Sequence, residues 1–413
     1  MKSDLPVSRA AYTLVSSLQQ GGYESYIVGG AIRDLLLGRA PKDFDIATSA
    51  TPEEIRAFFG RRNCHIIGKR FRLAHVFVDG MLFEVSTFRR NPQESTQKTY
   101  RENDGLKNDN LIIADNAFGT AQEDAFRRDF TVNALFYDPV KKEILDFTGM
   151  GLADIAARKV RAIGDPALRF EEDPVRMLRA LKLVGMFDFE LDNATENALF
   201  SRLKLLSCAA ASRLSLEWEK ILQSNYCDRH LEVFHDYGLL KYFLPFLDKN
   251  WGTPECQYAI KLLFERDCRI EEKQYRNSVS LALALLALPF VEKQLSGESG
   301  MMYTRNRGNR MVISDTINRL LAPLPIMLRI KYSAEKILDL LPDLIISDSF
   351  SREIFRNRSY NHAREAAIII GVVSGLDPDE LACRWPEGSD NCGRKNDCRR
   401  KPQKNKKNIV PDK

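Results

Sequence analysis

A pair of aspartates and a pair of glycines lie close together near the start of the sequence. Three short groups occupy seventeen residues: Gly29-Gly30, Arg33-Asp34 and Asp43-Phe44-Asp45. Aspartates at i and i+2 point to the same side of a β-strand. Asp43 and Asp45 could therefore share two Mg²⁺ ions about 4 Å apart, of which one activates an attacking hydroxyl and the other holds a nucleoside triphosphate.

The elements around these groups can position them for that chemistry. Residues 26–28 predict a short buried strand that ends at the glycine pair, and Ala31 to Leu37 predicts a helix closed by Gly38. The N–H groups of its first turn could cradle phosphate oxygens, with Arg33 adding charge. The spacing fits neither G-x-G-x-x-G nor G-x-x-x-x-G-K-[ST], which excludes dinucleotide-binding and P-loop folds.

A predicted hairpin supplies a third carboxylate. The strand of the aspartates should end near Ala47, and Thr51 should begin a capped helix through Phe59. Asp79-Gly80 then predicts a two-residue turn between strands 73–78 and 81–87. Opposed residue numbers would sum to 159, which places His75 opposite Glu84. We take Glu84 as the third active-site acid; the alternative is an exposed strand glutamate paired with an arginine.

Two further segments carry charge in an order that suits a nucleotide. Residues 90–120 predict a mobile loop beside the site, and a charged helix should begin at Glu123 with Arg127-Arg128-Asp129 at its centre. Arg128 could meet the triphosphate and Asp129 could orient it or the metal site. Surface pairing of both arginines with nearby acids is the alternative.

The segment 172–182 predicts a helix with a polar stripe beside an apolar one. The polar positions are three residues apart: Asp173, Arg176, Arg179 and Lys182. The apolar line is Val175, Leu178 and Leu181, which should face a core. Asp173 before Pro174 also suits a helix N-cap. An aspartate and an arginine in one turn present the acceptors and donors that read the edge of a base.

The length of the chain predicts two or three domains, and its strand and helix patterns predict an α+β protein. A chain of 413 residues exceeds what one core usually organises. We expect a head with a mixed sheet and helices at 1–150, a helical neck and body at 151–265 that binds RNA and the base, a helical C-terminal region at 266–387, and a disordered basic tail at 388–413. The net charge is only +5, but residues 399–407 contain six cations, which suits either RNA phosphates or solubility.

Cysteines and apolar runs give simple expectations. The eight cysteines form no C-x-x-C pair, which is typical of reduced thiols in the cytoplasm. Cys383, Cys392 and Cys398 are too widely spaced to predict a zinc site. The run from Leu281 to Val291 is too short to span a bilayer, so we expect no membrane partner and a buried helix stopped near Pro289.

Five ordered motifs together resemble the class II tRNA nucleotidyltransferase and bacterial poly(A) polymerase family, a branch of the polymerase-β-like nucleotidyltransferases. They are Val28 to Asp34, Asp43 to Asp45, Glu84 to Arg89, Arg127 to Ala134 and Glu172 to Arg176. The resemblance implies Asp43 and Asp45 as metal ligands, Gly30 and Arg33 as triphosphate contacts, and Asp129 as a further active-site acid. It also implies Asp173 and Arg176 as base readers with Arg179 beside them.

Within this family, the segment Ile66 to Val76 resembles the subgroup that adds adenylates rather than the sequence C-C-A. We therefore expect template-independent transfer of AMP from ATP to RNA 3′ ends. The predicted catalytic residues are Asp43, Asp45, Glu84 and Asp129; the metal ligands, for two Mg²⁺, are Asp43, Asp45 and Glu84; the nucleotide-binding residues are Gly29, Gly30, Arg33, Arg128, Asp173, Arg176 and Arg179.

Other functions are open to the same residues. A CCA-adding tRNA nucleotidyltransferase is the first alternative, and a catalytically silent RNA-binding protein is the second. Carboxylates alone also suit a metal-dependent nuclease, which would have no use for a triphosphate cradle. The partners that we expect are RNA 3′ ends, ATP and proteins of RNA decay, and we expect a monomer.

Overall fold

The computed structural model describes residues 1–68, 72–90, 118–346 and 354–387. The chain divides into two compact units. One is Met1–Trp251 with Leu321–Pro325, and the other is Gly252–Leu320 with Ile326–Lys413. Most of the predicted loop at 90–120, the predicted tail at 388–413, Cys392 and Cys398 lie outside the described residues.

The first unit contains a seven-stranded mixed sheet, as predicted for the head. Its strand order is β3-β4-β5-β2-β1-β6-β7, with β2 parallel to β5 and the other neighbours antiparallel. The strands are β1 (Ser25–Val28), β2 (Asp45–Thr48), β3 (Cys64–Ile67), β4 (Leu73–Val78), β5 (Met81–Thr87), β6 (Leu135–Asp138) and β7 (Glu143–Asp146).

The predicted hairpin is confirmed in both its limits and its register. Asp79 and Gly80 form the two-residue turn with φ of 51° and 74°, which is the left-handed backbone that such turns require. His75 lies directly opposite Glu84. The side of each strand that faces the core is thereby fixed, because a shift by one residue would exchange the two faces.

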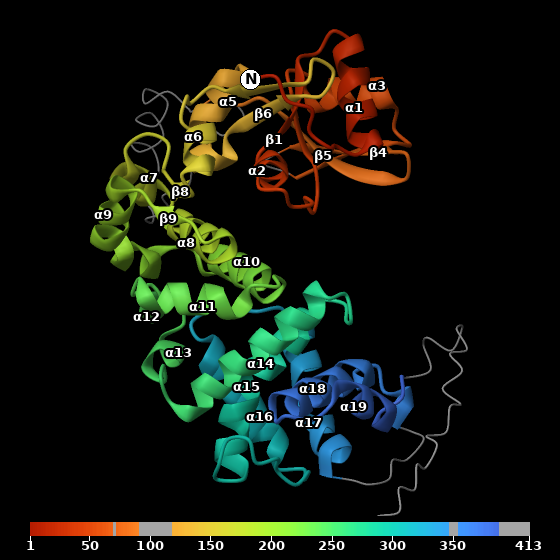
Figure 1. Ribbon diagram of the computed structural model, residues 1–413, viewed down its shortest axis with the longest axis vertical. Coiled ribbons are helices and arrows are strands. Elements are labelled where there is room, and N and C mark those ends of the chain that lie inside the picture. Colours follow the sequence, from red (N-terminus) through yellow and green to blue (C-terminus); the bar gives the residue numbers. More distant parts are fainter. Residues whose placement is uncertain (69–71, 91–117, 347–353, 388–413) are drawn as a thin grey trace, which may run out of the picture. The chain divides into compact units, whose positions relative to one another are not determined.

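Helices cover the sheet of the head (Figure 1). They are α1 (Arg9–Gln20), α2 (Gly30–Leu36), α3 (Pro52–Phe59), α5 (Ala121–Arg127) and α6 (Gly151–Ala156), with a short 3₁₀ turn, η1 (Thr131–Asn133). The predicted capping box is present, because the Thr51 hydroxyl accepts from the Glu54 N–H and the Glu54 carboxylate accepts from the Thr51 N–H. Helix α5 packs on an aromatic core that contains Tyr26, Phe88 and Phe136.

Helix α5 corrects one prediction. It begins at Ala121 and ends at Arg127, so Arg127-Arg128-Asp129 is the end of the helix and not its centre. The chain turns there because Arg128 has extended φ and ψ angles of −64° and 169°. Arg128 and Asp129 consequently leave the helix and reach different neighbours.

A helical region follows the head in the same unit. Its elements are β8 (Lys159–Val160), α7 (Pro166–Glu172), α8 (Val175–Phe187), β9 (Glu190–Leu191), α9 (Asn193–Arg202), η2 (Leu203–Cys208), α10 (Ala211–Leu222), α11 (Cys227–Asp236), α12 (Leu240–Phe243) and α13 (Pro245–Lys249). Val175, Leu178 and Leu181 are buried as predicted. Because this apolar face packs in the core, the rotation of α8 is fixed, and with it the direction of the polar stripe.

The second unit is helical in its described part. Its elements are α14 (Pro254–Glu271), α15 (Val279–Leu295), α16 (Asn309–Leu321), α17 (Leu328–Ile346), η3 (Ile354–Arg356), α18 (Tyr360–Val373) and α19 (Pro378–Arg384). Residues 281–292 are buried, but α15 continues through Pro289 to Leu295, so the expected stop at this proline is wrong. Burial on all sides of α15 outweighs the hydrogen bond that proline removes.

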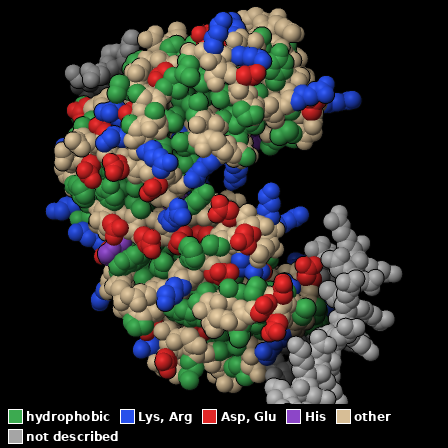
Figure 2. Space-filling model, in the orientation of Figure 1, with side chains coloured by type: hydrophobic (Ala, Val, Ile, Leu, Met, Phe, Trp, Pro, Cys, Tyr) green, Lys and Arg blue, Asp and Glu red, His purple; other side chains and the backbone are tan. Residues whose placement is uncertain are grey.

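Two surface properties complete the description. On the face that Figure 2 presents, lysine and arginine side chains are mixed with acidic ones over both units, in keeping with the small net charge. Of the helices in the described ranges, none combines the length and the apolar character needed to cross a membrane.

Candidate active site

The three predicted acids come together on one face of the sheet. Asp45 begins β2 and Asp43 precedes the strand, so only one of the two aspartates belongs to the strand itself. The parallel register pairs Ile46 with Val85, and one residue earlier on each strand are Asp45 and Glu84. Side chains of paired positions share a face. Asp45, Glu84 and His75 therefore form a row across β2, β5 and β4.

The charges of these acids influence one another. The Asp45 side chain keeps accessible surface, yet the protein around its carboxyl group, together with Asp43 and Glu84, raises its pKa to about 6, while Arg128 acts in the opposite direction. His75 Nε2 lies 3.6 Å from Glu84 Oε1. Burial, and then the two neighbouring carboxylates, thus disfavour the ionised form of Asp45.

A divalent cation is what this group of acids fits. Carboxylate oxygens are the ligands that Mg²⁺ prefers, and Mg²⁺ is commonly held by one or two carboxylates plus water and substrate phosphates. In the part of the chain that the structure describes, no three Asp, Glu, His or Cys side chains already enclose a metal site. Asp43 and Asp45 suit such an open site, and Glu84 as a third ligand stays a prediction.

The glycine pair makes room for two arginines. Gly29 has φ of 77° and precedes the first residue of α2. A Cβ atom at Gly29 would lie 3.2 Å from Arg128 Nη1, and one at Gly30 would lie 3.3 Å from Arg33 Nη2. Side chains at these positions would displace the guanidinium groups. Two facts therefore favour glycine at this turn: the space that the guanidinium groups occupy, and the positive φ of Gly29.

Both arginines are held by fixed partners. Arg33 is buried, forms an ion pair of 2.7 Å with Asp34, and donates to the Asn133 side chain. Arg128 donates to Asp124 at 3.0 Å and to the Asn133 carbonyl at 3.3 Å. Asp124 is itself buried. The pairing of Arg128 with an acid, considered above as an alternative, is thus present, but it anchors the arginine next to Gly29.

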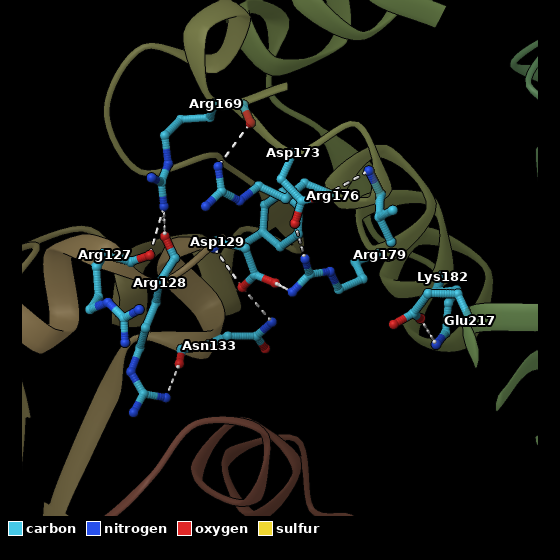
Figure 3. A network of polar contacts seen from close by, with 12 residues as sticks. Arg127, Arg128, Asp129, Asn133, Arg169, Asp173, Arg176, Arg179, Lys182 and Glu217 are labelled. Atoms are coloured by element: carbon cyan, nitrogen blue, oxygen red, sulfur yellow. Dashed lines mark hydrogen bonds and ion pairs between the residues drawn. The ribbon is translucent and has the colours of Figure 1, made fainter. Parts of the chain in front are cut away.

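A network of polar contacts joins the head to α8, as Figure 3 shows. Asp129 accepts from Asn133 Nδ2 at 3.3 Å and from Arg179 Nη1 at 3.3 Å. The other terminal nitrogen of Arg179 donates to Asp173 Oδ2 at 2.7 Å, and Arg213 of α10 donates to the same oxygen at 2.7 Å. Predicted residues from the head and from α8 therefore share one continuous network.

Asp173 has one of its two predicted roles, that of a helix cap, while its role as a base reader stays a prediction. It is buried at the end of α7, and its Oδ1 accepts from the Val175 N–H in the first turn of α8. This contact is the helix-capping role that the sequence left open. Its Oδ2 holds Arg179 and Arg213, so the carboxylate is fixed in one orientation.

Two members of the stripe turn to other partners. Arg176 donates to Glu172 Oε2 at 2.9 Å and to the Arg169 carbonyl at 2.8 Å. Lys182 pairs with Glu217 of α10 at 2.9 Å, and burial lowers the pKa of its ammonium group. Lys182 therefore links two helices, whereas Arg176 closes the junction between α7 and α8.

Several residues of the network were not singled out from the sequence. They are Asp124, Asn133, Arg169 and Arg213. Arg169 is buried and donates to the carbonyls of Arg127 at 2.7 Å and Arg128 at 2.6 Å. Asn133 stood within the Arg127 to Ala134 motif, and Asp124 is four residues before Arg128, which is the spacing of a helical ion pair. Arg169 gave no local signal, and Arg213 stood in a segment, Arg213 to Lys220, that resembled only a helix of the family's neck.

A mixed sheet with an acid pair beside a Gly-Gly turn, followed by helices, is the architecture of the polymerase-β-like nucleotidyltransferases. Two family models match the chain: the poly(A) polymerase head domain at residues 25–161, and a probable RNA and SrmB-binding site of polymerase A at residues 188–250. Over these ranges the chain is similar to the family of class II tRNA nucleotidyltransferases and bacterial poly(A) polymerases.

Individual relatives include both branches of this family. Poly(A) polymerase I of Haemophilus influenzae is 38% identical over 300 residues, which are 71% of this chain and 65% of that protein. A CCA-adding enzyme of Geobacillus is 38% identical over 260 residues, which are 63% of this chain and 60% of that protein. The chain thus spans less than two thirds of the length of these relatives.

The solved structures show the same architecture. The CCA-adding enzyme of Bacillus stearothermophilus in complex with CTP superimposes with a TM-score of 0.61 and 26% identity. The match covers 91% of this chain and 82% of that one. The predicted fold class, a nucleotidyltransferase head followed by a helical region, is therefore confirmed.

Proposed function

We propose that the protein transfers AMP from ATP to the 3′ hydroxyl of RNA without a template and releases pyrophosphate. The observation that carries this proposal is the group of Asp43, Asp45 and Glu84 on one face of the sheet, next to the Gly29-Gly30 turn and Arg128. The neighbouring carboxylates and the fixed cations beside them match the two needs of the reaction, which are a metal-binding face and a triphosphate-binding face.

Each part of the site has a role in this reaction. Asp43 and Asp45 would hold Mg²⁺, which when bound supplies Lewis acidity toward the RNA hydroxyl and the phosphates. Arg33 and Arg128 would bind the triphosphate and orient it, since their own partners already fix both guanidinium groups. Such prior fixation lowers the entropy that the site loses when the nucleotide binds.

The fixed state of Asp173 supports its proposed role as a base reader. Arg179 and Arg213 both hold Asp173 Oδ2. These contacts fix the acceptor that would read the base, and the choice of polyadenylation over CCA addition rests on the segment Ile66 to Val76.

CCA addition is the second candidate, supported by the 38% identity to the Geobacillus enzyme. The test offers ATP, CTP, GTP and UTP separately to the protein with an unstructured RNA and with a tRNA that lacks its terminal CCA, and then sizes the products. The proposal expects long products on both RNAs from ATP alone. Incorporation of CTP into the tRNA would support CCA addition instead.

A silent RNA-binding protein would shift RNA in a gel but incorporate no nucleotide. Asp43→Ala and Asp45→Ala serve as the negative controls of the assay, because contaminating polymerase activity would persist in both. A wild-type protein as inactive as these two variants in the presence of Mg²⁺ would overturn the proposed reaction.

A further inference from the structure

Asn133 contacts three of the predicted site residues. Its side-chain Oδ1 accepts from Arg33 Nη1, its Nδ2 donates to Asp129 at 3.3 Å, and its carbonyl accepts from Arg128 Nη1 at 3.3 Å. Asn133 is the last residue of η1 and is partly buried. One residue therefore touches both predicted triphosphate cations and the predicted active-site acid.

The amide side chain of Asn133 meets the needs of both of its neighbours. Arg33 can only donate hydrogen bonds, and an ionised Asp129 can only accept them. The amide accepts from the first with Oδ1 and donates to the second with Nδ2. An aspartate at this position would keep the acceptor but place a second negative charge beside Asp129, and a leucine of similar size would provide neither group.

The contacts continue from Asp129 to the predicted base readers. Arg179 Nη1 donates to Asp129 Oδ2, and Arg179 Nη2 donates to Asp173 Oδ2. Figure 3 shows Asn133, Asp129, Arg179 and Asp173 pointing toward one another in sequence. The order from the triphosphate side to the base side is therefore Arg33, Asn133, Asp129, Arg179 and Asp173.

We propose that Asn133 is a positioning residue that couples recognition of the base to the placement of the triphosphate. The proposal rests on the proposed function, in which Arg33 binds phosphate and Asp173 reads adenine. A base that fits Asp173 and Arg179 holds Asp129 in place, and Asn133 transmits that position to Arg33. A base that does not fit leaves the amide free to turn, so that Arg33 Nη1 loses its acceptor on Asn133 while the guanidinium group keeps its ion pair with Asp34.

The test measures binding, which separates it from the proposed reaction. The full chain with Mg²⁺, without RNA, is titrated calorimetrically with ATP, CTP and inorganic tripolyphosphate. The wild type should prefer ATP to CTP. Asn133→Leu should reduce this preference about tenfold, because the free energy of one hydrogen bond to a charged group corresponds to about a tenfold change in affinity. The variant should also bind tripolyphosphate more weakly.

A second variant and a control distinguish coupling from loss of structure. Asn133→Asp keeps an acceptor for Arg33 but no donor for Asp129, and should also lose the preference for ATP. Asn63→Leu, at an exposed turn position whose side-chain amide donates to the Phe59 carbonyl at 3.4 Å, should keep the wild-type preference. Circular dichroism and thermal unfolding confirm the fold of each variant.

Two results would overturn the coupling. In the first, the ratio of ATP to CTP affinity stays at the wild-type value in Asn133→Leu and Asn133→Asp, as it would if Asn133 only stabilised the fold. In the second, the wild type binds both nucleotides equally. A wild type that binds ATP preferentially but incorporates no AMP would contradict the proposed reaction and leave the coupling to be judged by the variants.

Discussion

The guanidinium group of Arg33 lies over the ring of Phe187, with 4.4 Å between its Cζ atom and the ring centroid. Arg39 contacts the same ring at 4.8 Å. Arg33 belongs to α2 in the head, and Phe187 is the last residue of α8. The aromatic ring is therefore a platform for a cation that the proposed function assigns to the triphosphate.

Loss of this ring should weaken ATP binding. We expect Phe187→Leu to raise the KM for ATP about threefold to tenfold with a smaller change in kcat, because a cation–π contact contributes about 0.5–2 kcal/mol. Phe187→Tyr should restore the wild-type KM. The matched control is Phe189→Leu, since Phe189 is equally apolar and buried and packs beside Phe187, the ring over which Arg33 lies. Equal KM values in both leucine variants would contradict the prediction.

Removal of the Asp45 charge should separate activity from stability. The pKa of Asp45 is raised to about 6, so the folded protein disfavours the ionised carboxylate relative to the unfolded chain. We expect Asp45→Asn to reduce AMP incorporation at least about 10²–10³-fold, as for other losses of electrostatic stabilisation, with a Tm at pH 7 that is unchanged or higher. Asp79→Asn, in the hairpin turn, is the control and should retain activity. A lower Tm for Asp45→Asn would show that the carboxylate stabilises the fold.

Arg213 should control the choice between nucleotides. It donates to Asp173 Oδ2 from α10, and without it the carboxylate has one fewer partner. We expect Arg213→Met to increase the incorporation of CTP relative to ATP by about threefold to tenfold, which corresponds to one charge-assisted hydrogen bond. Arg202→Met removes the ion pair of Arg202 with Glu171 and should leave the ratio unchanged. Competition between labelled ATP and CTP on one RNA measures both variants.

Glu292 should make the second unit less stable as the pH rises. It is buried, accepts from the Gly300 N–H at 2.7 Å, and burial raises its pKa to about 7. Since the folded state binds this proton more tightly than the unfolded state, its contribution to stability is complete below about pH 4.5 and is lost as the pH rises through about 7. Glu292→Gln keeps an acceptor without the charge.

The variant Glu292→Gln should therefore match the wild type near pH 4.5 and exceed it at pH 8, by up to about 3 kcal/mol in free energy of unfolding. Denaturant unfolding of the full chain at several pH values measures this difference. Glu298→Gln, at an exposed position, is the control and should show no pH-dependent gain. A constant difference between Glu292→Gln and the wild type would contradict the assigned titration.

Features that depend on near neighbours were predictable from the sequence. Asp79 and Gly80 fixed the hairpin because few dipeptides adopt the left-handed backbone of such a turn, and the register then placed His75 opposite Glu84. Thr51 and Glu54 predicted the start of a helix, because the two residues of a capping box are only three positions apart. In these cases, the information and its consequence lie in the same short segment.

Features that depend on distant partners were not predictable in this way. The contact of Arg213 with Asp173 joins residues 40 positions apart, and that of Arg33 with Asn133 joins residues 100 apart. The charge pattern around Arg128 suggested a continuing helix, but Arg128 leaves the helix to lie beside Gly29. Pro289 suggested a helix end, and packing around α15 outweighed that local preference.

The two contacts that helix α8 makes with the head limit where residues can be inserted into the chain. Arg179 near one end contacts Asp129, and Phe187 at the other end contacts Arg33. Each added residue advances an α-helix by about 1.5 Å and rotates the later side chains by about 100°. A single insertion between these two residues would thus point one of them away from the head. A substitution on this helix changes one contact, whereas an inserted residue between Arg179 and Phe187 changes the direction of every side chain that follows it.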